Sequence, residues 1–61
     1  MTYMIMFAGM TIEYITARDQ KAAEKKAARM FVQGPYKTVV INQDAPLAER
    51  QAALRLSTET L

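Results

Sequence analysis

The sequence predicts an α+β fold, in which a β-β-α-β path forms a three-stranded sheet with one amphipathic helix packed on it and a weaker C-terminal helix. Three observations predict this class. First, an apolar run and an alternating segment lie on either side of Gly9, which predicts two strands. Second, helix-forming residues lie between Asp19 and the pair Gly34-Pro35. Third, a β-branched run follows at residues 36–42 and predicts another strand. The helix joins two strands in a right-handed crossover, so those strands run parallel. The simplest sheet then places the first strand in the middle, antiparallel to both neighbours.

The first two strands are predicted to form a hairpin. Residues 3–7 are apolar at every position, which is typical of a short strand buried on both faces. Residues 8–10 supply the turn, because Gly9 adopts a positive φ without strain. Residues 11–17 begin with alternation, and the side chains that share one side are Ile12, Tyr14 and Thr16.

The first helix is predicted over residues 20–32, which are mostly strong helix formers without proline or glycine. Asp19 is a suitable N-cap for the free amides of the first turn. The sequence Gln33-Gly34-Pro35 ends the helix. At about 100° per residue, one stripe gathers the apolar side chains that pack on the sheet. They are Ala23, Ala27, Met30 and Phe31.

A third strand is predicted over residues 36–42, which are β-branched and bounded by turn residues. The C-terminal helix spans about residues 45–56, with Asp44 as its cap and Pro46 in its first turn. Its apolar positions do not fall on one clean stripe, so we expect a weaker helix.

Residues 1–61 form a single predicted domain, with its core at about residues 3–42. The tail, residues 57–61, has two interpretations. It frays, or residues 54–61 form an added strand in place of the end of the helix.

Composition excludes several classes of protein. A chain of 61 residues buries only about 60% of the surface that its unfolded form exposes, so the domain is marginally stable. It has no cysteine for a disulfide framework and no histidine for a zinc site. The apolar run near the N-terminus is far shorter than the roughly 20 residues of a membrane helix. We expect a soluble, cytoplasmic protein without membrane contact.

The sequence predicts no enzyme and no cofactor. Without histidine or cysteine, acid–base chemistry would fall to the carboxylates, for which helix capping and surface exposure are the simpler roles. They are Glu13, Asp19, Glu24, Asp44, Glu49 and Glu59. No acidic loop has the spacing of a calcium or magnesium site, and the two glycines are too isolated to cradle a phosphate.

The most informative polar feature is a basic stripe on the first helix, opposite the apolar one. It comprises Arg18, Lys21, Lys25 and Arg29, with Lys26 beside it. Such a face can meet an acidic protein surface or track a phosphate backbone. The alternative is a solvated outer face that keeps the domain soluble. No aromatic residue lies within the stripe, which disfavours binding to single strands.

Two methionines are the second candidate for partner binding. Met4 and Met6 project from the same side of the first strand, and flexible thioethers suit adaptable protein interfaces. The alternative is ordinary core beneath the C-terminal helix. We also expect a homodimer, formed through this sheet face or through an edge strand, residues 11–17 or 37–42.

The pattern over residues 10–42 resembles the strand–capped helix–strand layout of very small bacteriophage accessory proteins. The resemblance is carried by Ile12 to Ala17, Asp19, Ala23, Ala27, Phe31, Pro35 and Lys37 to Ile41. Some of these proteins inhibit bacterial RNA polymerase, and certain anti-CRISPR proteins share the outline. The resemblance implies a phage-encoded protein in the host cytoplasm that occludes something larger without chemistry of its own.

These observations predict a small non-catalytic protein-binding module that inhibits or regulates a larger protein complex. The residues expected to bind the partner are Arg18, Lys21, Lys25, Lys26, Arg29, Met4 and Met6. The alternative function is a nucleic-acid-binding protein that uses the same basic helix face.

Overall fold

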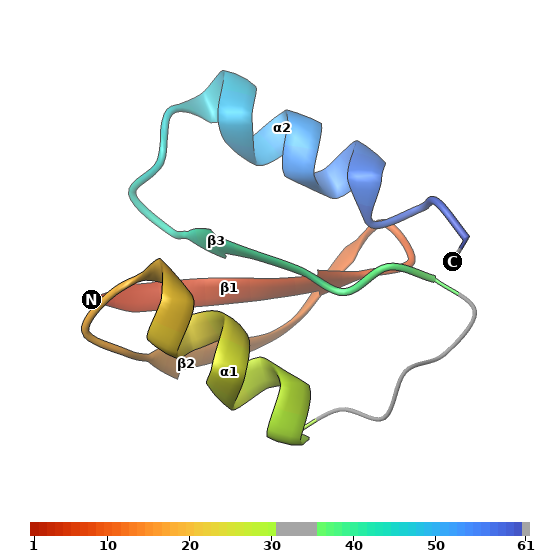
Figure 1. Cartoon of the computed structure of the whole chain (residues 1–61). Coiled ribbons are helices and arrows are strands. Elements are labelled where there is room, and N and C mark those ends of the chain that lie inside the picture. Colours follow the sequence, from red (N-terminus) through yellow and green to blue (C-terminus); the bar gives the residue numbers. More distant parts are fainter. Residues whose placement is uncertain (31–35, 61) are drawn as a thin grey trace.

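The computed structural model describes residues 1–30 and 36–60. Figure 1 shows two helices on either side of a small sheet. In chain order the elements are β1 (Thr2–Phe7), β2 (Met10–Thr16), α1 (Gln20–Met30), β3 (Val39–Asn42) and α2 (Leu47–Leu56). The strand order is β2-β1-β3, with β1 antiparallel to both neighbours. The predicted α+β fold and the central place of the first strand are therefore confirmed.

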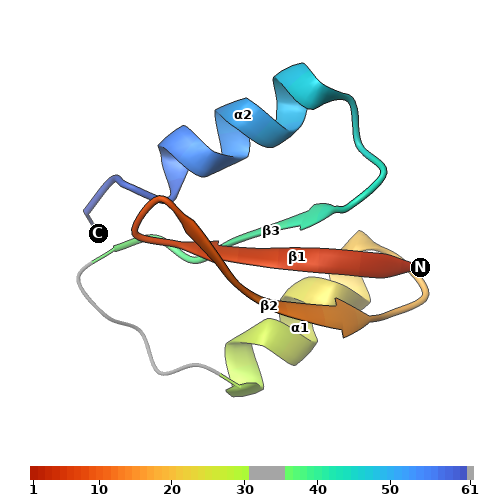
Figure 2. The same ribbon diagram turned by 180° about the vertical axis from the view of Figure 1, so that it is seen from behind.

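The central strand is buried on both faces, as its apolar sequence predicts. Tyr3 and Ile5 pack with Ala23 and Ala27 of α1 on one face, where Ile15 of β2 joins them. On the other face, α2 covers the sheet, as the reverse view in Figure 2 also shows. The buried residues there are Met4, Met6 and Ala53.

The hairpin turn consists of two residues, both with positive φ. Ala8 has φ 54° and Gly9 has φ 78°, the combination of a type I′ turn, whose twist matches that of the strands. Beyond the turn the register shifts, because Ile5 pairs with Glu13 while the next residue of β1 pairs with Thr11. Ile12 is thus the extra residue of a β-bulge, which breaks the alternation expected along β2.

Helix α1 begins as predicted. The Oδ1 atom of Asp19 accepts the amide of Ala22 at 2.8 Å, which confirms the N-cap. Ala23 and Ala27 are 0% and 2% exposed, so the helix sits close to the sheet. Met30 was expected on the same stripe, but it is 45% exposed because the last residue of the helix extends beyond the buried core. The predictions for Phe31 and for residues 32–35 lie outside the described residues.

The third strand is shorter than predicted and begins at Val39. Its expected first residues pair with the C-terminal tail instead. Tyr36 forms an antiparallel bridge with Thr60, and the Lys37 amide donates to the carbonyl of Glu59 at 2.9 Å. The tail therefore neither frays over these residues nor replaces the end of the helix, which continues to Leu56.

The predicted cap of α2 is wrong. The helix begins at Leu47 after Pro46, which occupies the N-cap position without any side-chain cap. Asp44 lies in a turn, where its amide donates to Oδ1 of Asn42 at 2.8 Å. Such an Asx turn is a local alternative to helix capping for this segment. Because only Ala53 is buried within α2, the expectation of a weak helix is confirmed.

A buried serine holds the end of α2 against the hairpin turn. Ser57 is 0% exposed, and its Oγ donates to the carbonyl of Leu54 at 2.6 Å. The same Oγ accepts the amide of Gly9 at 3.0 Å, and the Ser57 carbonyl accepts the amide of Ala8 at 2.8 Å. This arrangement satisfies the buried hydroxyl and fixes both amides of the tight turn.

Candidate functional site

The basic α1 face is defined as Arg18, Lys21, Lys25, Lys26 and Arg29. Lys21, Lys25 and Arg29 lie on the solvent side of α1, Arg18 just precedes the helix, and Lys26 lies at the flank of the row. All five residues are exposed. Lys21, Lys25 and Arg29 follow one another at four-residue spacing, which places them in a row with a rise of roughly 6 Å per step. Their stripe lies opposite Ala23 and Ala27, which pack on the sheet. The predicted separation of a basic and an apolar face is therefore confirmed.

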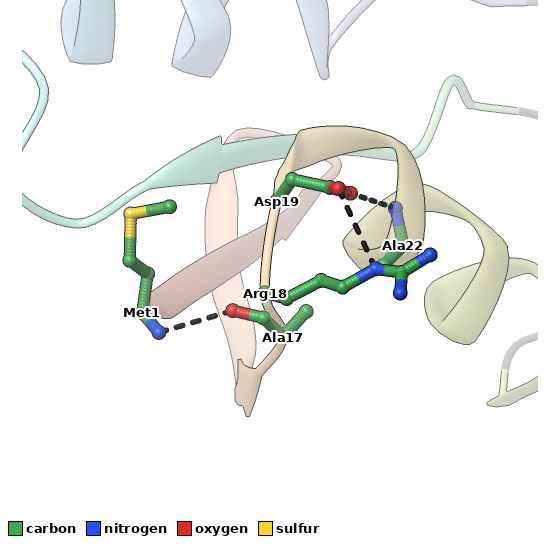
Figure 3. A network of polar contacts seen from close by, with 5 residues as sticks. All are labelled: Met1, Ala17, Arg18, Asp19 and Ala22. Atoms are coloured by element: carbon green, nitrogen blue, oxygen red, sulfur yellow. Dashed lines mark hydrogen bonds and ion pairs between the residues drawn. The ribbon is translucent and has the colours of Figure 1, made fainter.

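The two ends of this face differ in their contacts. Figure 3 shows the Asp19 carboxylate between the amide of Ala22 and the side chain of Arg18. The Nε atom of Arg18 lies 3.6 Å from Oδ2 of Asp19, with the two side chains 88% and 55% exposed. An ion pair so exposed contributes little stability. Lys26 turns toward the sheet, where its Nζ donates to the carbonyl of Thr16 at 3.2 Å.

The cations at the centre of the basic α1 face form no ion pair among the described residues. Among the described residues, the ion pairs are Arg18–Asp19 and Lys37–Glu59, and neither involves Lys21, Lys25 or Arg29. The acidic residue within the helix, Glu24, lies beside Gln20, whose Nε2 is 3.3 Å from its Oε2. The three central cations are thus free to meet negative charge on a partner.

The methionines are not part of an accessible surface, so this expectation is wrong. Met4 and Met6 are 7% and 4% exposed and pack against Ala53. Val39 and Ile41 complete this cluster from β3. The alternative interpretation, core beneath the C-terminal helix, is the correct one, because the small side chain of Ala53 lets α2 approach the sheet closely.

Exposed large apolar side chains on β2 and α2 were not among the predicted site residues. Helix α2 packs over β3 and β1, so it leaves part of β2 uncovered. The exposed apolar side chains of β2 are Met10, Ile12 and Tyr14, at 63%, 41% and 57% exposure. Those of α2 are Leu47, Leu54 and Leu56, at 60%, 37% and 44%. The missing stripe of α2 was the sequence signal for this incomplete cover. The homodimer stays a prediction.

Several carboxylates have local partners that suit structural roles. Asp19 caps α1, and Glu13 accepts the amide of Tyr14 at 3.1 Å through its Oε1. Glu59 lies 3.4 Å from the Nζ of Lys37. Within residues 1–30 and 36–60, no three acidic residues gather to hold a metal ion. In the same part of the chain, neither helix is long and apolar enough to cross a membrane.

None of the protein-family models, curated proteins or solved structures compared with this chain matches it.

Proposed function

We propose that this chain is a small non-catalytic protein-binding module that inhibits or regulates a larger macromolecular complex through the basic α1 face. The observation that carries the proposal is the row of Lys21, Lys25 and Arg29, which are exposed and take part in none of the ion pairs among the described residues. Charge of one sign that is not compensated within the domain steers association with an acidic surface and suppresses wrong partners.

Two further features support this mode of binding. The row lies on a helix that the alanine contacts hold close to the sheet, so the cations project from a rigid element. Rigid presentation lowers the entropy lost on binding. The resemblance of residues 10–42 to small bacteriophage accessory proteins supports an inhibitory role and a phage-encoded origin, with the host cytoplasm as the place of action.

Charge reversal of the row tests the proposal. The variant Lys21→Glu/Lys25→Glu/Arg29→Glu changes the net charge from +2 to −4, since each of the three reversals removes two units. We expect its affinity for the acidic partner to fall by roughly a hundredfold or more, because like charges then face each other across the interface. A folded triple variant that binds as tightly as the wild type would rule out this face.

A matched pair of single variants separates the local effect from the change in net charge. Lys25→Glu and Arg55→Glu alter the charge equally, but Arg55 is exposed on α2, away from the basic α1 face. We expect only Lys25→Glu to weaken binding. Equal losses in both variants would point to net charge and contradict a specific contact surface.

Nucleic-acid binding is the second candidate, and the regular row of cations favours it. Four-residue spacing on a helix repeats at roughly 6 Å, a distance that lets successive cations reach separate phosphates. If about four phosphates are neutralised, a fourfold increase in salt lowers the affinity about 150-fold. Binding that barely changes over that range would exclude this candidate and leave the protein-binding proposal in place.

A further inference from the structure

The edge of β2 exposes main-chain groups that could pair with another strand. Figure 3 shows one end of the β1–β2 pairing, where the Met1 amino group donates to the Ala17 carbonyl at 3.0 Å. The Ala17 amide donates back to the Met1 carbonyl at 2.9 Å. Bonded pairs alternate along an antiparallel ladder, so Ile15 also bonds toward β1. The main-chain groups of Tyr14 and Thr16 therefore point outward from the sheet.

Side chains occupy two of these outward groups, the Tyr14 amide and the Thr16 carbonyl. Oε1 of Glu13 accepts the Tyr14 amide at 3.1 Å, and Nζ of Lys26 donates to the Thr16 carbonyl at 3.2 Å. Between the two ends of β2, the bulge at Ile12 interrupts the regular ladder. Bulges, edge lysines and charged side chains are devices by which natural sheets avoid edge-to-edge pairing.

At the opposite edge, β3, a side chain also occupies an outward main-chain group. The Gln43 amide donates to the Thr2 carbonyl at 3.1 Å, so by the same alternation Val40 points its main-chain groups outward. Nε2 of Gln20 donates to the Val40 carbonyl at 2.6 Å.

We infer that Glu13, Lys26 and Gln20 act as edge guards, which close both sides of the sheet to strand addition by a partner or a second copy. The need for guards is physical, since an open seven-residue strand that also exposes Met10, Ile12 and Tyr14 is a template for self-association. This inference goes beyond the proposed function and replaces the expectation that an edge strand is a docking site. Partners are then expected to bind to the faces of the molecule and not to a strand edge.

Opening the β2 edge tests the inference. The variant Glu13→Thr/Lys26→Ala removes both guards of β2 and keeps residues compatible with a strand and a helix. The control Glu49→Thr/Lys25→Ala makes the same chemical changes at exposed positions on α2 and α1. In sedimentation experiments up to about 1 mM, we expect the open-edge variant to associate beyond the state shared by the wild type and the control, by one further pairing through the β2 edge. This pairing should protect the amides of Tyr14 and Thr16 from hydrogen exchange.

Two outcomes would overturn the inference. One is a wild-type protein that dimerises with protected Tyr14 and Thr16 amides. The other is an open-edge variant that folds and yet associates no further than the wild type over the same range of concentrations.

A second measurement does not depend on dimerisation. In dilute monomer, the Tyr14 amide should exchange about fivefold faster in Glu13→Thr than in the wild type, because one hydrogen bond is lost. Equal exchange rates would show that Glu13 does not guard this amide.

Discussion

At the scale of single residues, Ser57 links the last turn of α2 to the hairpin. Its Oγ both donates to Leu54 and accepts from Gly9, and no water reaches the side chain. We expect Ser57→Ala to lower the free energy of unfolding by about 1–3 kcal/mol, because the amide of Gly9 loses its acceptor. Thr58→Ala is the matched control, since Thr58 is exposed and its hydroxyl only donates to the carbonyl of Arg55. Urea unfolding measures the free energy of unfolding of both variants, and equal decreases in the two would contradict the role of Ser57.

The two residues of the hairpin turn should respond in opposite directions to substitution. Ala8 has φ 54°, a region that costs a residue with a Cβ about 1–2 kcal/mol. We expect Ala8→Gly to stabilise the protein by about 0.5 kcal/mol after the entropy of the unfolded chain is included. Gly9→Ala should cost about 1–3 kcal/mol, since φ is 78° and the new Cβ would lie 3.1 Å from Cγ2 of Thr58. Thermal unfolding measures both, and effects of the same sign would contradict the observed turn.

At the scale of elements, the two helices begin in different ways. Asp19 caps α1, whereas Asp44 only precedes α2 and caps nothing among the described residues. We expect Asp19→Ala to destabilise the protein by about 1 kcal/mol and Asp44→Ala to change stability by less than about 0.5 kcal/mol. Denaturant unfolding of both variants checks this. A large decrease in the free energy of unfolding of Asp44→Ala would instead support Asp44 as the cap of α2.

The different starts of α1 and α2 also show which elements can be predicted from the sequence. Helix α1 was predicted well because its cap, its alanines and its composition all agree. The start of α2 was not, because Asn42 competes for the main chain near Asp44 and forms a turn instead. The bulge at Ile12 and the bridge of Tyr36 to Thr60 depend on contacts between distant segments, which no local pattern contains.

At the scale of the whole molecule, the basic row lies on α1, whereas most of the exposed large apolar side chains lie on β2 and α2. The accessible surface of 4241 Å² is close to the about 4,000 Å² of a folded monomer of this size.

The basic candidate site could be predicted from the sequence, because helical spacing alone separates Lys21, Lys25 and Arg29 from the buried alanines. The burial of Met4 and Met6 could not, because it depends on the position of α2 over the sheet.

A pull-down from the lysate of the protein's natural host, with and without nuclease, tests whether the basic α1 face binds a protein partner. Wild type, Lys25→Glu and Arg55→Glu would serve as tagged baits, with bound proteins identified by mass spectrometry. We expect a near-stoichiometric protein partner that survives nuclease and is retained by wild type and Arg55→Glu, but lost or much reduced with Lys25→Glu. Retained proteins that nuclease releases, or a partner held equally by all three baits, would contradict this expectation.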